Sequence, residues 1–193
     1  MRKNLSNRLP GKLIIRPYRP EDEAQVLNLV RELESELAEK FPQVKIESGV
    51  ETYRTRYLKK GNKYVMYVAE VNKKIVGFLL GYPSLGIPEV DSLYDVLPLN
   101  GEKATDEFYL QMTFVSRAYR NRGISTALHR AVIKYALEHG YREVYACIAK
   151  WNIPELKVIR SLKFESQDLG TRYRLSLKFD EQSSSPRKRG GGG

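Results

Sequence analysis

The stretch from residue 119 to residue 140, YRNRGISTALHRAVIKYALEHG, starts with a glycine between two arginines and continues with helical spacing. Apolar residues recur every three or four positions, which predicts an amphipathic α-helix of about five turns. Gly140 predicts the end of this helix, because a glycine after the last turn readily takes the left-handed conformation. The apolar positions are Ile124, Leu128, Ala131, Val132, Tyr135 and Ala136.

The beginning of this helix has the features of an anion site. Backbone N–H groups in a first helical turn have no partner within the helix and carry roughly half a positive charge. Arg120 and Arg122 stand beside them, and Gly123 has no Cβ, so a bulky phosphate could approach the main chain closely. The residues alone leave one alternative, a surface helix with a basic entrance that contains a glycine.

Outward from this helix, the periodicity predicts a mixed α/β sheet. The helix joins two predicted strands and is long enough for a parallel crossover. Residues 64–70 and 75–82 indicate a hairpin with a tight turn at Asn72. A capping-box pattern, Ser48-Gly49-Val50-Glu51, predicts a second helix that runs to Gly61. The other predicted strands are 12–18, 108–115, 143–149 and 171–179, with a short one near Phe164, and the other predicted helices are 21–40 and 154–162.

The composition fits one globular domain over residues 12–179. The chain has 193 residues, of which 41% are hydrophobic and 29% charged, enough to bury a substantial core. We expect a flexible basic arm at 1–11 and a disordered, low-complexity tail at 180–193 that need not be native. The sequence has no apolar run of membrane-spanning length and no signal core. Its one cysteine, Cys147, excludes an internal disulfide and fits the cytoplasm.

The positive charge is concentrated in the second half of the chain. Residues 1–107 hold 17 Lys and Arg against 16 Asp and Glu, whereas residues 108–193 hold 16 against 7. Such a field can attract nucleic acid, anionic lipid or a phosphate-rich small molecule, and charge alone does not choose among them.

Two motifs connect these elements to a known family. Arg120-Asn121-Arg122-Gly123-Ile124-Ser125 matches Q/R-x-x-G-x-G/A, with Ser125 in the last small position, five residues after the end of a predicted strand. Asn152 begins a segment similar to N-x-x-A-x-x-x-Y-x-x-x-G-F, and IIRPYRPEDE is similar to a first strand and helix. Over roughly residues 12–179, the chain resembles the GNAT superfamily of acyl-CoA-dependent N-acetyltransferases.

The resemblance implies both a fold and a cofactor site. The implied fold is α/β, with a central mixed and mostly antiparallel sheet whose fourth and fifth strands splay apart, flanked by helices. Acetyl-CoA is implied as the acyl donor, and no metal is expected. Main-chain amides would hold the pyrophosphate, and the fourth strand would pair with the pantetheine arm. The implied cofactor-binding residues are Thr113, Phe114, Val115, Arg120, Asn121, Arg122, Gly123, Ile124, Ser125, Thr126 and Asn152.

The chain departs from the family at the positions that carry catalysis. The tyrosine that protonates the leaving thiolate falls at Ile159, the glycine of the Gly-Phe pair at Lys163, and the alanine after the asparagine at Glu155. Histone-type members place a glutamate base where this chain has Tyr109, and ribosomal-protein alanine acetyltransferases place one at Cys147.

The remaining candidates for catalysis are therefore argued from chemistry. Tyr109 and Glu107, with Asp106 as a third choice, are the candidate bases for removing a proton from the amine, directly or through a water; the alternative for each is a surface residue without a catalytic role. We interpret Cys147 as a buried strand residue rather than a nucleophile. Trp151 is interpreted as a core or rim aromatic beside Asn152, and the two histidines, His129 and His139, as helix-surface residues.

The resemblance implies acetyl transfer from acetyl-CoA to a primary amine by direct attack in a ternary complex. Residues 86–107 hold six carboxylates against one lysine, which favours a cationic acceptor: a polyamine, an aminoglycoside-like amine, or a peptide lysine or N-terminus. A solvated acidic loop is the alternative for this segment. A non-catalytic acyl-CoA sensor is the alternative for the whole domain, and a homodimer stays open. Nucleic-acid binding is disfavoured because the basic residues are scattered.

Overall fold

The structure, a computed structural model, describes residues 9–40, 49–59, 63–84 and 105–179. Residues 1–8 of the predicted arm (1–11), residues 86–104 of the acidic segment (86–107) and the predicted tail at 180–193 lie outside these residues. Within them, seven strands form one sheet in the order β1-β2-β3-β4-β5-β7-β6. The strands are β1 Leu13–Pro17, β2 Val65–Val71, β3 Lys74–Pro83, β4 Glu107–Val115, β5 Glu143–Ala149, β6 Glu165–Asp168 and β7 Arg172–Lys178.

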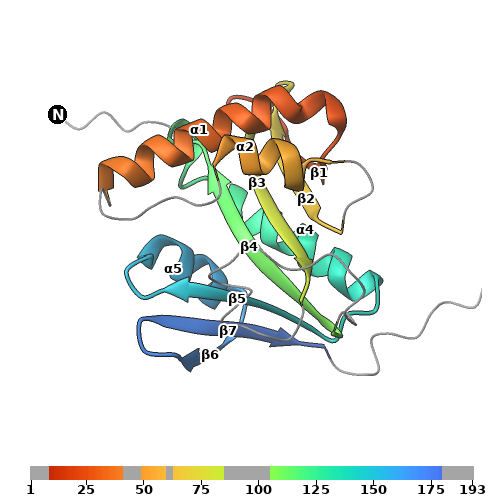
Figure 1. Ribbon diagram of the computed structural model, residues 1–193, viewed down its shortest axis with the longest axis vertical. Helices are drawn as coiled ribbons and strands as arrows, with labels where there is room; N and C mark the ends of the chain where they lie inside the picture. Colours follow the sequence, from red (N-terminus) through yellow and green to blue (C-terminus); the bar gives the residue numbers. More distant parts are fainter. Residues whose placement is uncertain (1–8, 41–48, 60–62, 85–104, 180–193) are drawn as a thin grey trace, which may run out of the picture.

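Helices cover both faces of the sheet (Figure 1). On one face, α1 packs apolar residues such as Val26 and Val30 against Phe78 of β3. On the other face, α4 buries Leu128 and Val132 in a core that also receives residues of α5. The helical elements are η1 Pro20–Asp22, α1 Glu23–Lys40, α2 Val50–Thr52, η2 Tyr53–Tyr57, η3 Arg117–Tyr119, α4 Ile124–Glu138 and α5 Ile153–Ser161. None of the described helices is long and apolar enough to cross a membrane.

The predicted hairpin is confirmed as β2 and β3, which pair antiparallel. Asn72 and Lys73 both have positive φ values, 51° and 63°, and connect the strands in two residues. Such a turn has the twist that a two-residue hairpin needs. Strand β3 is buried along most of its length, because helices lie on both of its faces.

The parallel crossover is also confirmed, since β4 pairs parallel with β5 on the two sides of α4. This pairing covers only Glu107–Glu143, Phe108–Val144 and Tyr109–Tyr145, although both strands continue beyond it. On its other edge β4 stays paired with β3 up to Val115. The two central strands therefore splay apart after Tyr109 and Tyr145, as the predicted fold class requires.

A β-bulge at Gln111 lies where the splay begins. Leu80 pairs with Met112 and Gly81 with Leu110, which leaves Gln111 as an extra residue in β4. The bulge shifts the alternation of side chains, so that Leu110 belongs to the core under α4 while Met112 packs with the core under α1. Gly81 is required opposite the bulge, because a Cβ there would come within 2.7 Å of the Tyr109 carbonyl oxygen.

The second helix differs from its prediction. Its N-cap is Gly49 rather than Ser48, which lies outside the described residues, and no side chain of the capping residue closes the helix. Instead the Val50 N–H donates to the Glu34 carboxylate of α1 at 3.2 Å. The helix then widens into the π-turn η2. The helix therefore begins one residue later than predicted, and a side chain sixteen positions away supplies an acceptor to its first turn.

Candidate active site

The splay exposes an edge of β4 between its bulge and its end. The ladder between β4 and β5 ends at Tyr109 and Tyr145, so residues 110–115 of β4 do not pair with residues 146–149 of β5. Backbone N–H and C=O groups along such an edge need hydrogen-bond partners from elsewhere. The predicted cofactor residues Thr113, Phe114 and Val115 lie on this stretch of β4.

The loop from β4 to α4 forms a left-handed turn around Gly123. Asn121 and Gly123 have positive φ values of 61° and 76°. Gly123 is the N-cap of α4, and it provides no side chain to bond the N–H groups of the first turn, which comprises Ile124, Ser125 and Thr126. A Cβ at Gly123 would meet no described atom within 4 Å. The predicted anion site therefore consists of N–H donors beside open space.

Arg120, by contrast, is already engaged within the protein. Its guanidinium forms two hydrogen bonds with Glu36 of α1, at 2.8 and 2.5 Å, and its Nε donates to the Val115 carbonyl at 2.8 Å. These contacts hold the loop between β4 and α4 against α1 and occupy one carbonyl at the end of β4. Arg122, the basic residue next to Gly123, has its guanidinium 5.8 Å from the Tyr119 ring centroid.

Acid should remove the stabilisation that Glu36 provides. The Arg120 hydrogen bond lowers the Glu36 pKa from 4.5 to about 2, so the stabilisation is complete above pH 4.5 and disappears as the pH falls toward 2. We expect Glu36→Gln to lower the free energy of unfolding by about 1–2 kcal/mol at pH 7 and by much less at pH 3. Urea denaturation at both pH values measures this, with Glu39→Gln, an exposed change on the same helix, as the control. An equal gap at both pH values would contradict it.

Asn152 marks the beginning of α5 on the opposite side of the splay. Its side-chain oxygen accepts a hydrogen bond from the Glu155 N–H at 3.4 Å, and Pro154 lies in the first turn. Both residues favour a helix start at this point. Asn152 thus follows the end of β5, where the resemblance placed a cofactor contact.

His129 corrects an expectation, since it is buried and not on the helix surface. Only 1% of it is exposed. Its ring lies between three elements, with Nδ1 2.9 Å from the Ser125 carbonyl oxygen and Nε2 3.1 Å from Glu155 Oε1 and 3.4 Å from Thr113 Oγ1. His139, at the end of α4, is exposed as expected and stacks on Tyr135.

Tyrosines surround the closed end of the splay. Tyr109 packs between Tyr82 and Tyr145, with ring centroids 5.4 and 5.1 Å apart. The row continues through Tyr64. The Tyr145 hydroxyl lies 2.7 Å from the Ser84 hydroxyl, and both residues are buried. Sequence reasoning missed Tyr145 and Ser84, whose contact joins positions 61 residues apart.

Two glutamates share one arginine beside these tyrosines. Arg174 of β7 donates to Glu107 at 3.2 Å and to Glu143 at 2.7 Å, and its guanidinium carbon lies 3.8 Å from the Tyr145 ring centroid. Burial alone would lower the Arg174 pKa, but the Glu143 hydrogen bond and the two carboxylate charges raise it overall. The cluster of Glu107, Glu143 and Arg174 thus carries a net charge of −1. Asp106 pairs with Arg142 at 3.6 Å, where both side chains are largely exposed.

Comparison with known protein families identifies this arrangement. Residues 30–164 match the profile of the Acetyltransferase (GNAT) family, which is more than half of the chain. The chain belongs to the GNAT acetyltransferase family. It is therefore an enzyme of the acetyltransferase class, as the motif at residues 120–125 predicted. A search of curated protein sequences found no match.

Solved structures of GNAT proteins share this fold at low sequence identity. A GCN5-related N-acetyltransferase from Kribbella flavida is 19% identical with a TM-score of 0.66, covering 86% of this chain and 98% of its own. The PaiA N-acetyltransferase of Thermoplasma acidophilum, solved with coenzyme A, is 14% identical with a TM-score of 0.62, covering 87% and 99%. NAA60 of Arabidopsis thaliana, solved with a bisubstrate analogue, is 21% identical with a TM-score of 0.59, covering 86% and 98%.

The departures from the GNAT motif have visible structural consequences. Ile159, at the tyrosine position, is fully buried in the core under α4 and α5. Lys163 has φ = 65°, the left-handed conformation that explains why the family motif has glycine there. The GNAT site of this chain therefore keeps the backbone course of the motif but has no hydroxyl at position 159.

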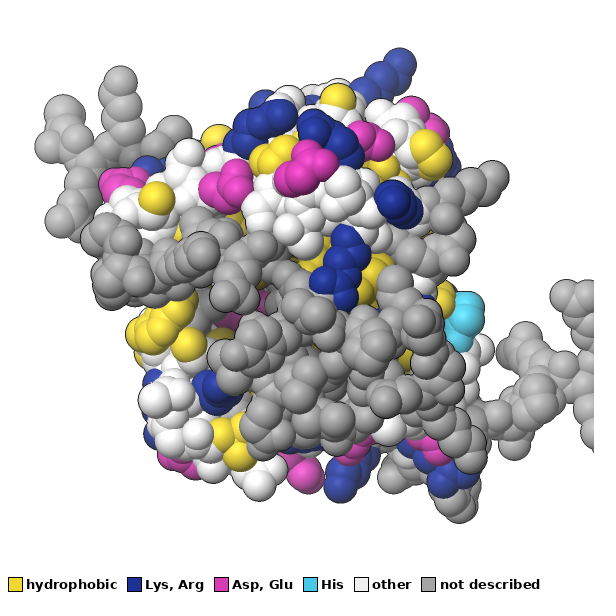
Figure 2. Space-filling view, in the orientation of Figure 1, with side chains coloured by type: hydrophobic (Ala, Val, Ile, Leu, Met, Phe, Trp, Pro, Cys, Tyr) yellow, Lys and Arg dark blue, Asp and Glu magenta, His cyan; other side chains and the backbone are white. Residues whose placement is uncertain are grey.

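Cys147 lies in the splayed part of β5, and Trp151 lies in the turn that follows this strand. Cys147 is half-buried in the strand and packs beside the tyrosine cluster, close to the interpretation from the sequence. Trp151 is a rim aromatic with 56% of its surface exposed, and Ile153 next to it is 51% exposed. An apolar area is visible in Figure 2 where β5 meets α5.

The described residues contain no group of three His, Cys, Asp or Glu side chains that could hold a metal.

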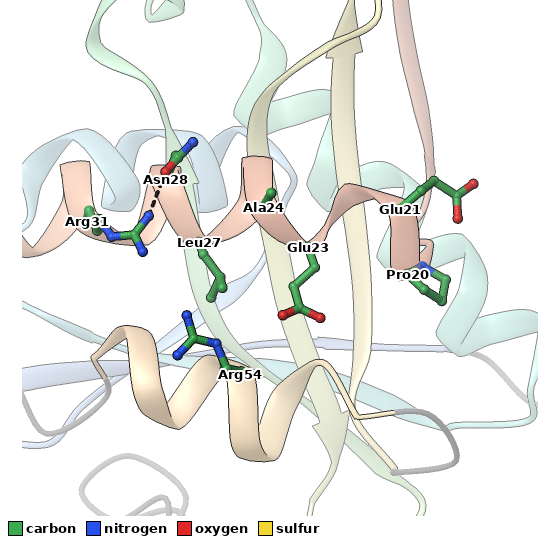
Figure 3. Close-up of a pocket in the computed structure, with 8 residues that line it drawn as sticks. All are labelled: Pro20, Glu21, Glu23, Ala24, Leu27, Asn28, Arg31 and Arg54. Carbon is green, nitrogen blue, oxygen red and sulfur yellow. Dashed lines mark hydrogen bonds between the residues drawn. The ribbon is translucent and has the colours of Figure 1, made fainter.

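A separate groove lies between α1 and η2 (Figure 3). It has a volume of about 430 Å³, and its lining carries charges of both signs. Glu23 and Leu27 point into the gap from α1, and Arg54 points into it from η2. None of the predicted cofactor or catalytic residues lines this groove, so it is distinct from the splay. The lining residues are Pro20, Glu21, Glu23, Ala24, Leu27, Asn28, Arg31 and Arg54.

Proposed function

We propose that this enzyme transfers the acetyl group of acetyl-CoA to a cationic primary amine by direct attack in a ternary complex. One observation carries the proposal: the ladder between β4 and β5 stops at Tyr109 and Tyr145 while both strands continue. The amide-rich pantetheine arm can bond to such an edge as an added strand would. The N–H groups around Gly123, at the far end of the same edge, offer donors for its pyrophosphate.

The reaction needs a proton to leave the amine before attack. An ammonium with a pKa of about 10.4 is neutral in only about one molecule in two thousand at pH 7. The neutral nitrogen then attacks the thioester carbonyl, the new C–N bond forms, and the C–S bond breaks to release the CoA thiolate. The second proton that leaves the nitrogen goes to this thiolate or to solvent, which gives the neutral amide. A thiol with a pKa of about 8.5 is a tolerable leaving group, so the missing tyrosine at Ile159 need not prevent turnover.

Tyr109 and Glu107 are the proposed proton acceptors, directly or through a water. Tyr109 is the last β4 residue before the splay, where the acetyl end of an inserted arm would arrive. Glu107 lies two residues earlier and shares Arg174 with Glu143. A carboxylate at this position can accept a proton. Asp106 is the less suitable candidate because its ion pair with Arg142 lies in solvent.

The net negative charge beside the splay supports a cationic acceptor. Glu107 and Glu143 place two carboxylates against the single guanidinium of Arg174. The neighbouring tyrosine row adds aromatic faces, to which an ammonium group is also attracted. A polyamine, an aminoglycoside-like amine, or a peptide lysine or N-terminus all carry this chemistry. Of the six carboxylates at 86–107 from which the preference was first argued, the four between residues 89 and 102 lie outside the described residues.

An amine panel tests the activity. We expect acetyl-CoA alone to release little thiol, and cationic amines to release it rapidly. Acetyl-CoA binding without thiol release across a broad panel would favour the sensor alternative instead.

Salt should weaken binding of the preferred amine. At saturating acetyl-CoA, we expect its KM to rise by about fivefold between low ionic strength and about 0.5 M salt, because charges beyond a few ångströms are screened. Glu107→Gln should flatten this dependence, whereas Glu138→Gln, an exposed change at the other end of α4, should not. A salt-insensitive KM in the wild-type enzyme removes the argument for a cationic acceptor.

A further inference from the structure

We propose that His129 and Glu155 form an imidazolium–carboxylate pair that positions α4 against α5 and thereby sets the affinity for the cofactor. This inference rests on the proposed use of acetyl-CoA. It assigns a positioning role to two residues that are not part of the motif match. Glu155 also stands where the family motif has alanine, so the pair is a feature of this chain.

The geometry assigns the protons on the ring. Nδ1 lies 2.9 Å from the Ser125 carbonyl oxygen, which can only accept, and 3.5 Å from the Ser125 hydroxyl, which can take either role; the shorter contact places a proton on Nδ1. Nε2 lies 3.1 Å from Glu155 Oε1, and a carboxylate oxygen also only accepts. The Thr113 hydroxyl at 3.4 Å can take either role and does not decide the matter. A bare Nε2 facing the carboxylate would be repelled, so the ring is best explained as doubly protonated and positive.

The location of the pair explains what it positions. Its ring contacts Ser125 in the first turn of α4 and Thr113 on the splayed edge of β4, both predicted cofactor residues. Glu155 belongs to the first turn of α5. The N-cap of this helix is Asn152, which is also a predicted cofactor residue. The pair therefore connects all three segments that are proposed to contact the CoA arm.

Burial makes the pair sensitive to the loss of either partner. His129 is 1% exposed and the Glu155 side chain 22%. A buried ion pair contributes little net stability, but removal of one partner leaves the other charge unmatched and drives the neighbouring elements to shift. A shift of the first turn of α4 relative to α5 would misplace donors at both ends of the CoA arm.

The sign of one mutational effect separates positioning from simple electrostatics. Glu155→Ala removes a negative charge near a polyphosphate ligand, which by charge alone should strengthen binding. Positioning predicts the opposite, a Kd for acetyl-CoA about tenfold higher by calorimetry. Glu155→Gln, whose amide oxygen can accept from Nε2–H, should stay within about threefold of wild type. Glu138→Ala removes the same charge from an exposed site on α4 and should leave the Kd unchanged or slightly lower.

A spectroscopic measurement tests the charge of the ring without any cofactor. The ¹⁵N resonances of His129 at pH 7 should show both ring nitrogens protonated, and His139→Asn assigns them because the chain has only two histidines. A neutral ring with a bare Nε2, or a Glu155→Ala enzyme that binds as tightly as wild type, overturns the inference. Wild-type protein that takes up no acetyl-CoA would overturn the proposed function instead, and the resonances would still report on the pair.

Discussion

Replacing Gly123 with glutamate should weaken acetyl-CoA binding by at least about 100-fold. The site around Gly123 consists of first-turn N–H groups beside open space, and a Cβ there would point into that space without touching any described atom. A glutamate would fill the approach and place a negative charge next to the pyrophosphate. Two unit charges about 4 Å apart near a protein surface repel by about 4 kcal/mol, more than the roughly 2.7 kcal/mol that 100-fold requires. Calorimetric titration with acetyl-CoA measures the loss.

The other end of the same helix provides a matched control. Gly140 has φ = 81° against 76° for Gly123, and a Cβ there would likewise meet nothing within 4 Å. Gly140→Glu therefore introduces the same charge and a similar left-handed strain of about 1–2 kcal/mol, but far from the cofactor loop. Its Kd should match that of wild type. If both variants bind equally well, the pyrophosphate does not sit at this helix start.

Periodicity predicted the elements of this fold because most of them are amphipathic along their own length. The β5 boundaries, Glu143–Ala149, agree with the prediction to the residue. In α4 the apolar stripe of Ile124, Leu128, Val132 and Ala136 is buried as its spacing requires. The parallel pairing of β4 with β5 could also be predicted, since a long helix between two strands permits them to run in the same direction.

The features that periodicity missed depend on residues far away in the sequence. His129 follows Leu128 on α4, and only the position of α5 decides whether that flank of the helix is covered. Arg120 looked like a ligand residue in its motif, yet its guanidinium binds Glu36, 84 positions earlier. Local patterns contain no information about such partners.

The candidate site was predicted unevenly for the same reason. A main-chain site leaves a local signature, because Gly123 is needed for a left-handed turn before a helix. Its cofactor contacts stay a prediction. The side chains around the proposed bases leave no such signature, since Tyr145, Ser84 and Arg174 meet Tyr109 and Glu107 only through the register of four strands. The bulge at Gln111 is equally invisible to a pattern that assumes strict alternation.

Tyr109→Phe should reduce kcat by about 100-fold while changing the KM of either substrate by less than about threefold. General base catalysis contributes at least this much, and loss of a hydroxyl from a buried ring changes packing little. Tyr109 is 3% exposed and is the last β4 residue before the splay, and this position is the reason for proposing it as the proton acceptor. Steady-state kinetics with the preferred amine measure both parameters.

Tyr82→Phe is the control that separates proton transfer from packing. Tyr82 pairs with Tyr109 across β3 and β4, is 2% exposed, and contacts the same ring at 5.4 Å between centroids. It lies on β3, one strand away from the splay, so its variant should keep kcat within about twofold. Equal losses in the two variants would assign the effect to the tyrosine row as a packed unit. An unchanged kcat in Tyr109→Phe would exclude Tyr109 as the base, and a large kcat loss in Glu107→Gln would then assign the proton to Glu107, the carboxylate that Arg174 holds beside the opening.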